Sequence, residues 1–259
     1  MRIALVHSFY RSDAPSGENI AVLRQAEALR TAGHEVLLVA RHSDEEMKTR
    51  GYPAKAALTV ATGVGPSPLD EIRRYNPDVV HVHNLFPNFG DRWVGAWKGP
   101  LVVTLHNYRP ICANGLLFRD GGLCTLCPDG DRWAGLRYRC YRESRIATLP
   151  LSLRNLGGPD TQALLRRADR IIVLSERARM MWANSGIAAS RTVVIPNGLP
   201  ESSAPRAGSR RGWVVVGRLT PEKGILELLE DWPSGQPLDI IGDGELSRQI
   251  QQRLRSRPL

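Results

Sequence analysis

Short apolar runs and amphipathic stretches alternate along most of the chain. The runs rich in valine, isoleucine and leucine predict buried strands over Ile3–Val6, Glu35–Ala40, Leu58–Ala61, Asp78–Val82, Leu101–Leu105, Arg170–Leu174 and Thr192–Ile195. Apolar residues at a helical period predict helices over Glu18–Ala32, Leu69–Tyr75, Thr161–Ala168 and Glu176–Asn184. Because strands and helices that alternate in this way favour a parallel sheet covered by helices, we expect an α/β fold.

A second and shorter set of such elements follows the segment 201–211, whose sequence is ESSAPRAGSRR. The segment is small, polar and proline-containing, which is typical of a linker. Strands are expected at Trp213–Val216 and Leu238–Ile241, and a helix is expected to begin at Pro221. We therefore predict a Rossmann-like domain over 1–200, a linker over 201–211 and the start of a second Rossmann-like domain over 212–259.

Two cations stand close together in the second domain. Arg218 follows the carboxyl end of the expected strand Trp213–Val216, which is where open α/β sheets bind ligands. Lys223 falls in the first turn of the helix that is expected to begin at Pro221. Two cations beside the free N–H groups of a helix N-terminus suit a diphosphate. A plain βαβ unit with two solvated cations fits the same residues.

Histidines mark the ends of two expected strands in the first domain. His81 and His83 stand two residues apart, so their side chains should lie on one face, and His83 is nearer the strand end where ligands bind. His106 directly follows Leu101–Leu105. For each histidine the alternative is a structural, hydrogen-bonded role.

The region 110–145 interrupts the alternation and holds all four cysteines, Cys112, Cys124, Cys127 and Cys140. In a cytosolic protein, four cysteines that include a C-x-x-C pair favour a structural zinc site over disulfides. Four reduced thiols are the alternative. The basic and aromatic segment Arg137–Arg145 suits contact with an anionic acceptor or with lipid head groups, and it equally suits a solvated charged face.

The composition is that of an ordinary globular protein with an excess of positive charge. The chain has 259 residues, of which 42% are hydrophobic and 24% charged, and its net charge is +9. This balance allows nucleic acid, an anionic membrane surface or anionic small molecules as partners. No nucleic-acid-binding signature occurs, no apolar run reaches the roughly 20 residues that cross a membrane, and the N-terminus does not read as a secretory signal. We expect a cytoplasmic protein without a nucleic-acid partner, associated at most peripherally with the inner face of the cell membrane.

Three motifs of the second domain together resemble the donor half of family 4 glycosyltransferases of the two-domain GT-B type: Gly217-Arg218-Leu219, Glu222-Lys223-Gly224 and Gly242-Asp243-Gly244. The resemblance implies that Arg218 and Lys223 grip the diphosphate of a nucleotide sugar. It also implies that His106, in the strand-end pattern Thr-x-His, reaches the donor sugar at the reaction centre.

Other parts of the first domain extend the resemblance. Gly17 maps to the glycine-rich loop that faces the donor phosphate. Pro196-Asn197-Gly198 is similar to the family's turn at the domain junction, so Asn197, with His83, is expected to line the cleft. The acid that usually comes two places after this turn is replaced by Pro200, with Glu201 next to it.

The resemblance implies a retaining, hexosyltransferase-like enzyme that moves a sugar from a nucleotide-diphosphate sugar to a glycan, lipid-linked or small-molecule hydroxyl. Exopolysaccharide is among the acceptors left open. No metal is implied in the reaction, because two cations supply the charge that a metal would. In such sites the leaving phosphate is the expected base for the acceptor hydroxyl.

The family's E-x7-E segment would lie beyond Leu259, so we expect a chain truncated in its donor domain. Helix faces such as Leu226/Leu229 and Leu246/Ile250 would then expose apolar surface unless a second chain or the first domain covers them. The main alternative function is a catalytically silent relative that binds a nucleotide sugar or a partner protein. An NAD-dependent enzyme is disfavoured, because the first βα turn lacks G-x-G-x-x-G.

Overall fold

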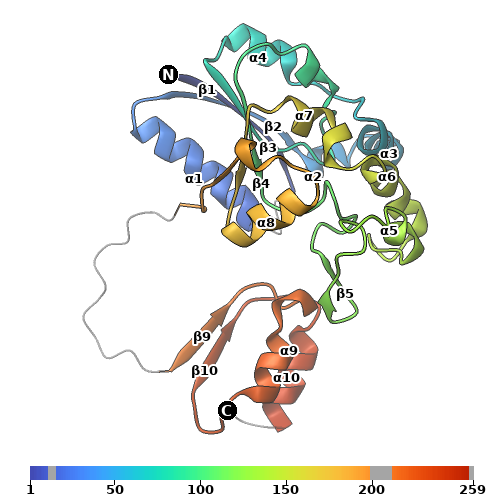
Figure 1. Cartoon of the computed structure of the whole chain (residues 1–259). Helices are drawn as coiled ribbons and strands as arrows, with labels where there is room; N and C mark the ends of the chain where they lie inside the picture. Colours follow the sequence, from blue (N-terminus) through green and yellow to red (C-terminus); the bar gives the residue numbers. More distant parts are fainter. Residues whose placement is uncertain (11–15, 199–211, 257–259) are drawn as a thin grey trace. The chain divides into compact units, whose positions relative to one another are not determined.

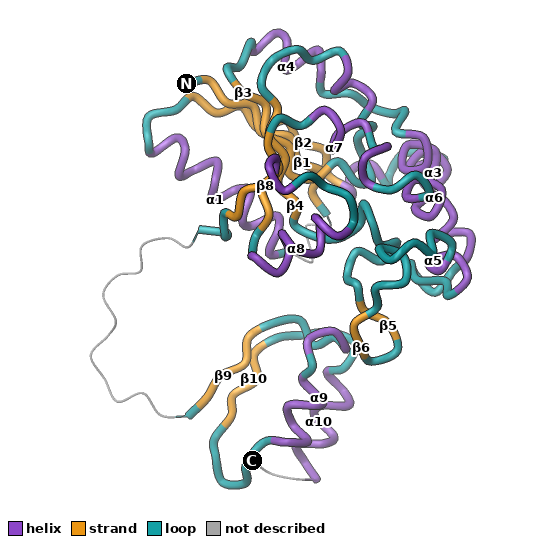
Figure 2. Tube along the Cα trace, in the orientation of Figure 1, coloured by secondary structure: helices purple, strands orange, loops and turns teal. Residues whose placement is uncertain are grey.

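The computed structural model describes residues 1–10, 16–198 and 212–256. It divides into two compact units, Met1–Leu117 with Thr125–Pro200, and Phe118–Cys124 with Glu201–Leu259. The first unit is built on a six-stranded sheet, and Figure 2 shows its strands side by side with helices around them. Among the described residues, no helix combines the length and the apolar character that spanning a bilayer requires.

All strands of the first unit's sheet run parallel, in the order β2-β1-β3-β4-β7-β8 (Figure 1). They are β1 (Arg2–Phe9), β2 (Glu35–His42), β3 (Val79–Asn84), β4 (Leu101–Leu105), β7 (Arg170–Val173) and β8 (Thr192–Val194). Each of these was predicted within a few residues, and the α/β, Rossmann-like class of the fold is confirmed.

Helices cover both faces of this sheet, as parallel sheets require. The helices of the first unit are α1 (Gly17–Thr31), α2 (Ser43–Glu46), α3 (Tyr52–Thr62), α4 (Leu69–Tyr75), α5 (Ala134–Arg137), α6 (Arg145–Asn155), α7 (Ala163–Arg167) and α8 (Glu176–Asn184), with 3-10 turns at Arg92–Gly95, Pro159–Thr161 and Ala189–Arg191. Alternate residues of β1 point to opposite faces. Leu5 packs with Ala26 of α1, whereas Val6 belongs to the larger core that contains Ile72 of α4.

One local prediction for the first unit is wrong, and helix α6 was missed. The expected strand Leu58–Ala61 lies inside α3, which ends at Gly63 with a φ of 70°. The β-branched pair Thr59-Val60 favours a strand, but the alanine-rich window and the glycine terminator outweigh it. Helix α6 was not predicted, because Pro150 stands in its interior and proline argues against a helix there.

The pairing of β1 with β3 contains an irregularity that affects a candidate residue. Val6 pairs with Val82, but the next residue, His7, pairs with Asn84. His83 is therefore the extra residue of a bulge at the carboxyl end of β3. Bulges of this kind re-aim side chains and occur next to functional sites.

The second unit has a parallel pair of strands with two helices against it. Its elements are β9 (Trp213–Val216), a 3-10 turn at Pro221–Lys223, α9 (Ile225–Asp231), β10 (Leu238–Ile241) and α10 (Ser247–Ser256), together with the hairpin β5 (Phe118–Arg119) and β6 (Gly122–Leu123). The helix expected from Pro221 thus begins as a 3-10 turn. The α-helix follows only after Gly224, whose φ is 66°.

The second unit buries the helix faces that were expected to be exposed. Leu229 and Ile250 are buried and share a small core with partly buried residues of both strands. The exposed apolar surface lies instead on the other side chains of the strands, Val214, Val216 and Ile241. Two parallel strands are enough to cover one layer of helices, and they leave their second face open.

Candidate functional site

The order of strands in the first unit places its ligand-binding edge between β1 and β3. The chain passes from β1 to β2 on one side and continues through β3 and β4 on the other, so this is the switch point of the sheet. Three histidines lie at or next to the strand ends there: His7 in β1, His83 in β3 and His106 just after β4. The fold thus brings together residues that are far apart in the sequence.

His83 and His106, two of the predicted site residues, are in direct contact. Nδ1 of His83 lies 2.9 Å from Nε2 of His106, so one ring donates this hydrogen bond and the other accepts it. The ring of His81 stacks on that of His83 with centroids 4.2 Å apart, as the shared face predicted. His81 Nε2 is bonded in turn to Thr104 Oγ1 at 2.7 Å. Thr104 of the Thr-x-His pattern therefore supports the row of histidines.

Burial keeps these histidines neutral. It lowers the pKa of His7, His81 and His106 to about 4, and it lowers the pKa of His83 well below the usual value, with the neighbouring histidines adding to the shift. At neutral pH the pair His83–His106 is thus a neutral hydrogen-bonding unit. The second ring nitrogen of His83, Nε2, is buried without a partner. The rings can orient a hydroxyl group, and they add no positive charge.

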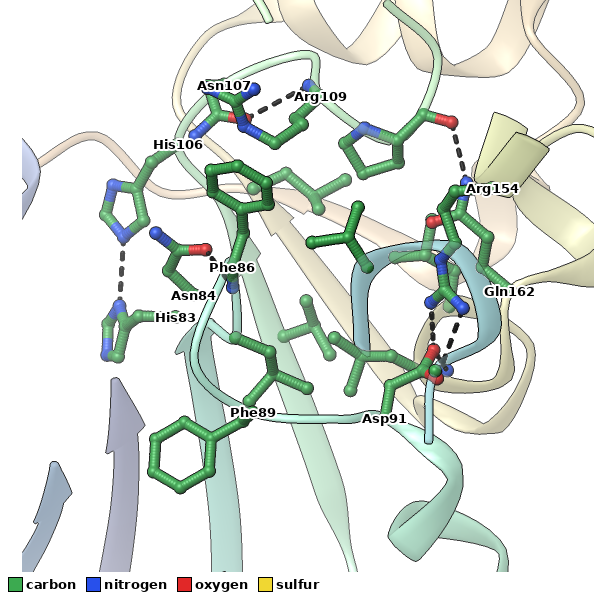
Figure 3. Close-up of a pocket in the computed structure, with 18 of the residues that line it drawn as sticks. His83, Asn84, Phe86, Phe89, Asp91, His106, Asn107, Arg109, Arg154 and Gln162 are labelled. Carbon is green, nitrogen blue, oxygen red and sulfur yellow. Dashed lines mark hydrogen bonds and ion pairs between the residues drawn. The ribbon is translucent and has the colours of Figure 1, made fainter. Parts of the chain in front are cut away.

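A cavity of about 120 Å³ adjoins the pair. Its wall is formed by residues of β3, β4, α3, α6 and α7. Figure 3 shows His83 and His106 at one end and the ion pair of Asp91 with Arg154 at the other. The cavity thus combines an apolar lining with polar groups at both ends, which is the usual composition of a ligand site.

A buried carboxyl group next to His106 was missed by the sequence reasoning. Glu18 stands in the first turn of α1, and its Oε2 accepts a hydrogen bond from Asn107 Nδ2 at 3.3 Å. Its other oxygen, Oε1, is buried without a partner. Burial raises the pKa of Glu18 to about 7, against the opposing effects of Asn107 and Arg109. In the sequence this residue resembles any acid that favours a helix N-terminus, so no signal marked it.

Arg109 is a second residue that was missed. Its guanidinium lies 4.2 Å from the ring centroid of Phe86 and 5.5 Å from that of Tyr141. Its Nη1 donates to the backbone oxygen of Ala113 at 3.2 Å. The polar run that follows His106 was the available signal, because residues after a strand end line the binding edge.

Gly17 begins α1 and is exposed. Ser16 caps the helix, accepting a hydrogen bond from the backbone N–H of Asn19 at 3.1 Å. Among the described residues, no atom lies within 4 Å of a Cβ atom placed on Gly17.

The motif around Arg218 is held by two glycines of the second unit. A Cβ atom on Gly242 would lie 1.8 Å from the backbone oxygen of Gly217, and one on Gly244 would lie 2.4 Å from that of Leu219. The backbone N–H of Leu219 donates to the oxygen of Asp243 at 2.9 Å. The Gly-Asp-Gly turn can therefore pack against the segment that carries Arg218 only because it has no side chains at these positions.

Of the other predicted residues, Gly17 and Asn197 of the first unit are not among those that line the cavity. Arg218 contacts Glu222 at 3.2 Å, and Asn197 is exposed in the coil after β8. Pro200, Glu201 and the linker 201–211 lie outside the described residues. Arg218 and Lys223 belong to the second unit, and Gly17, His83 and His106 to the first. Their joint role stays a prediction.

The four cysteines were predicted to hold a structural zinc ion or to be reduced thiols. Across the described residues, no three His, Cys, Asp or Glu side chains are grouped so as to hold a metal ion. Cys112 is buried, and its Sγ lies 3.0 Å from Asn114 Oδ1. The structure therefore gives the zinc prediction no support.

The sequence over residues 15–202 matches the model of the family Glycosyltransferase Family 4. The chain belongs to glycosyltransferase family 4. A relative, the exopolysaccharide phosphotransferase of Streptomyces coelicolor, is 34% identical over 119 residues, which cover 40% of this chain and 13% of that protein. Residues 15–202, which match the family model, include Gly17, His83, His106 and Asn197.

Two solved structures are similar to this family 4 chain over 99% of its length. They are the apo form of the lipopolysaccharide outer core galactosyltransferase WaaB, with a TM-score of 0.48 and 12% identity, and Anabaena Alr3699/HepE in complex with UDP, with a TM-score of 0.47 and 15% identity. The chain spans 65% and 66% of the lengths of these two proteins.

Proposed function

We propose that this family 4 chain carries the site of a retaining glycosyltransferase, which moves a sugar from a nucleotide-diphosphate sugar to a hydroxyl acceptor. The observation that carries the proposal is the pair His83–His106 at the switch point of the sheet, next to a cavity. In this role the neutral His106 hydrogen-bonds a hydroxyl group of the donor sugar, and His83 fixes its orientation. The acceptor is a glycan, a lipid-linked sugar or a small molecule.

Arg218 and Lys223 neutralise the leaving diphosphate in this proposal, and the backbone at Gly17 approaches it from the first unit. Charge-assisted hydrogen bonds from two cations supply the stabilisation that a metal ion gives in other transferases, so the reaction is proposed to need no metal. An oxygen of the leaving phosphate accepts the proton of the acceptor hydroxyl. The same face of the sugar is attacked, which retains the anomeric configuration.

The first test is calorimetric titration of the full chain with UDP, GDP and ADP. Binding of one of them is expected, and R218A/K223A should weaken it at least about 100-fold, since each lost charge-assisted hydrogen bond costs on the order of 1.5–3 kcal/mol. The matched control is R248A/R255A, which removes two cations from α10 of the same unit. Failure to bind any of the three, or equal loss in both variants, would reject the diphosphate site.

Two further variants separate binding from transfer. G17A meets no atom of the described residues, so reduced nucleotide affinity with unchanged stability would support a close approach of the phosphate. H106A should keep the nucleotide affinity and lose transfer from the matching nucleotide sugar. Transfer that persists in H106A would remove this histidine from the reaction centre. Nucleotide binding without transfer in the unaltered chain would favour the silent relative.

A further inference from the structure

Helix α6 turns its apolar side chains outward and its polar side chains inward. The residues that face the protein are Thr148, Leu151, Ser152 and Asn155, all of them buried. Three of these four are polar. Thr148 Oγ1 accepts a hydrogen bond from the backbone N–H of Tyr141 at 3.0 Å, and Asn155 Nδ2 donates to Arg109 O at 2.9 Å. The inner face of α6 is therefore largely polar, and hydrogen bonds of Thr148 and Asn155 attach it to neighbouring segments.

The opposite face of the helix carries a stripe of large aliphatic residues. Ile146 is 87% exposed, and Leu149, Leu153 and Leu156 are between 37% and 42% exposed. Their spacing of three, four and three residues places them on one side of a helix. We call these four residues the α6 outer face. A helix that only met water on this side would carry polar residues there, so the stripe indicates a non-aqueous contact.

Aromatic and aliphatic side chains are also exposed on the elements that pack against α6. Figure 1 shows α3, α5 and α6 grouped at one side of the first unit, and α6 packs against both of the others. Trp133, at the start of α5, and Tyr138, at its end, are both about 45% exposed. Leu58 of α3 is exposed as well. Tryptophan and tyrosine are the residues that favour the boundary between lipid and water.

Arginines border the α6 outer face on its N-terminal side. The segment Arg137–Arg145 contains four arginines and one glutamate, and all four arginine side chains are exposed. Arg137 is paired with Asp131 at 2.7 Å, and Arg142 lies over the ring of Tyr141. Long basic side chains next to an aliphatic stripe are typical of helices that lie in a membrane interface, with their charges at the phosphates.

A second copy of the chain fits this surface less well than lipid does. An isologous contact through the α6 outer face would bring the arginines of the two copies toward each other, and like charges oppose association. An anionic lipid surface satisfies both features, because its head groups attract the arginines and its acyl boundary accepts the aliphatic stripe. The same surface uses neither the histidine pair nor the cations of the second unit.

We propose that the α6 outer face, with Trp133, Tyr138 and the arginines of 137–145, docks the protein on an anionic lipid surface. The helix lies parallel to that surface, with Ile146 and Leu153 at the depth of the acyl boundary. Docking occurs on the side of α6 away from the cavity, whose wall includes Leu151 and Asn155 of the same helix. A lipid-associated acceptor would thereby be held near the site without covering it.

The test is flotation of the full chain with two kinds of vesicle, phosphatidylcholine alone and phosphatidylcholine mixed with phosphatidylglycerol. The unaltered protein is expected to float with the mixed vesicles at low ionic strength and to be released by salt. I146S/L153S should lower vesicle affinity at least about tenfold, because two aliphatic side chains no longer enter the lipid. R139Q/R145Q should lose the preference for phosphatidylglycerol.

The matched control is L23S/M180S, which removes two comparably exposed apolar side chains from α1 and α8 and should float as the unaltered protein does. If the double variant does not fold, I146S alone, at the most exposed position of the stripe, replaces it in the flotation test. Equal flotation of I146S/L153S and the control, or no flotation of the unaltered protein, would overturn the proposal. If sedimentation analysis showed that the unaltered protein is a dimer and that I146S/L153S is a monomer, the α6 outer face would be an interface with a second copy, and the lipid proposal would be overturned. Nucleotide binding, measured on the same samples, is expected to be unchanged, so this outcome is read separately from the proposed function.

Discussion

Nδ1 of His83 lies 2.9 Å from Nε2 of His106, which joins the carboxyl end of β3 to that of β4. The bulge in β3 places His83 in this position, and burial keeps both rings neutral. In a neutral pair of this kind, the N–H of one ring donates a hydrogen bond to the other ring. Each ring can change its tautomer when a hydroxyl group approaches. At neutral pH it acts by hydrogen bonding and adds no charge.

The buried histidines predict a loss of stability in mild acid. His7, His81 and His106 have a pKa of about 4 in the folded chain and 6.5 when unfolded, so the unfolded chain binds protons first. Their contribution is complete above pH 6.5 and is lost as the pH falls through about 4. One pKa unit corresponds to about 1.4 kcal/mol, so the loss should reach several kcal/mol. Urea unfolding at pH values across this range measures the loss. If H81Q left the pH dependence of the unfolding free energy unchanged, the assignment of this loss to the buried histidines would be contradicted.

Glu18 predicts the opposite dependence on pH. Its pKa is about 7 in the folded chain and 4.5 when unfolded, so its contribution to stability is present below pH 4.5 and is lost as the pH rises through 7. E18Q removes the buried charge and should exceed the unaltered chain in unfolding free energy above pH 7, by up to about 3 kcal/mol. In acid the two should converge. E27Q, at an exposed position of the same helix, should change nothing at either pH.

The ion pair of Arg154 with Asp91 should be worth more than a surface pair, because the Asp91 carboxylate is buried and also accepts from the backbone N–H of Leu164 at 3.2 Å. R154M leaves that charge unpaired and should cost about 3–5 kcal/mol of unfolding free energy. Adding D91N to R154M removes the unpaired charge and should restore part of the lost unfolding free energy. R179M breaks an exposed pair with Glu176 and should cost at most about 1 kcal/mol. If chemical denaturation gave equal costs for R154M and R179M, the Asp91 carboxylate would be solvated like that of an exposed pair.

Gly244 should tolerate no side chain. In G244A the new Cβ atom meets the backbone of Leu219 and not a flexible side chain, so the turn must shift, at a cost of about 1–3 kcal/mol. Hydrogen exchange of the amides of β9 and β10 measures this within the second unit. G217A adds its Cβ to open space in the same motif and should leave that exchange unchanged. Faster exchange in both variants would mean that the close approach at Gly244 is not what holds the segment of Arg218.

Much of the fold follows from local patterns in the sequence. β4, β9, β10, α4 and α8 have the predicted limits, because each is a compact apolar run or a helical period bounded by its own start or stop residue. The motif around Arg218 was also visible, and the structure adds the reason for its glycines. Strand-end positions pointed to His83 and His106 because the carboxyl ends of parallel strands share one edge.

Tertiary structure decided the features that depend on residues far apart in the chain. The contact of Glu18 with Asn107 joins residues 89 positions apart, and the pair Asp91–Arg154 joins residues 63 apart, so neither has a local pattern. The orientation of α6 belongs here as well. Its sequence contains both polar and aliphatic residues, and only the folded structure shows that Thr148, Ser152 and Asn155 face the interior. The sequence by itself determined the family, the α/β class and the strand-end histidines, whereas burial, which only packing creates, determined which of these groups are neutral, paired or exposed.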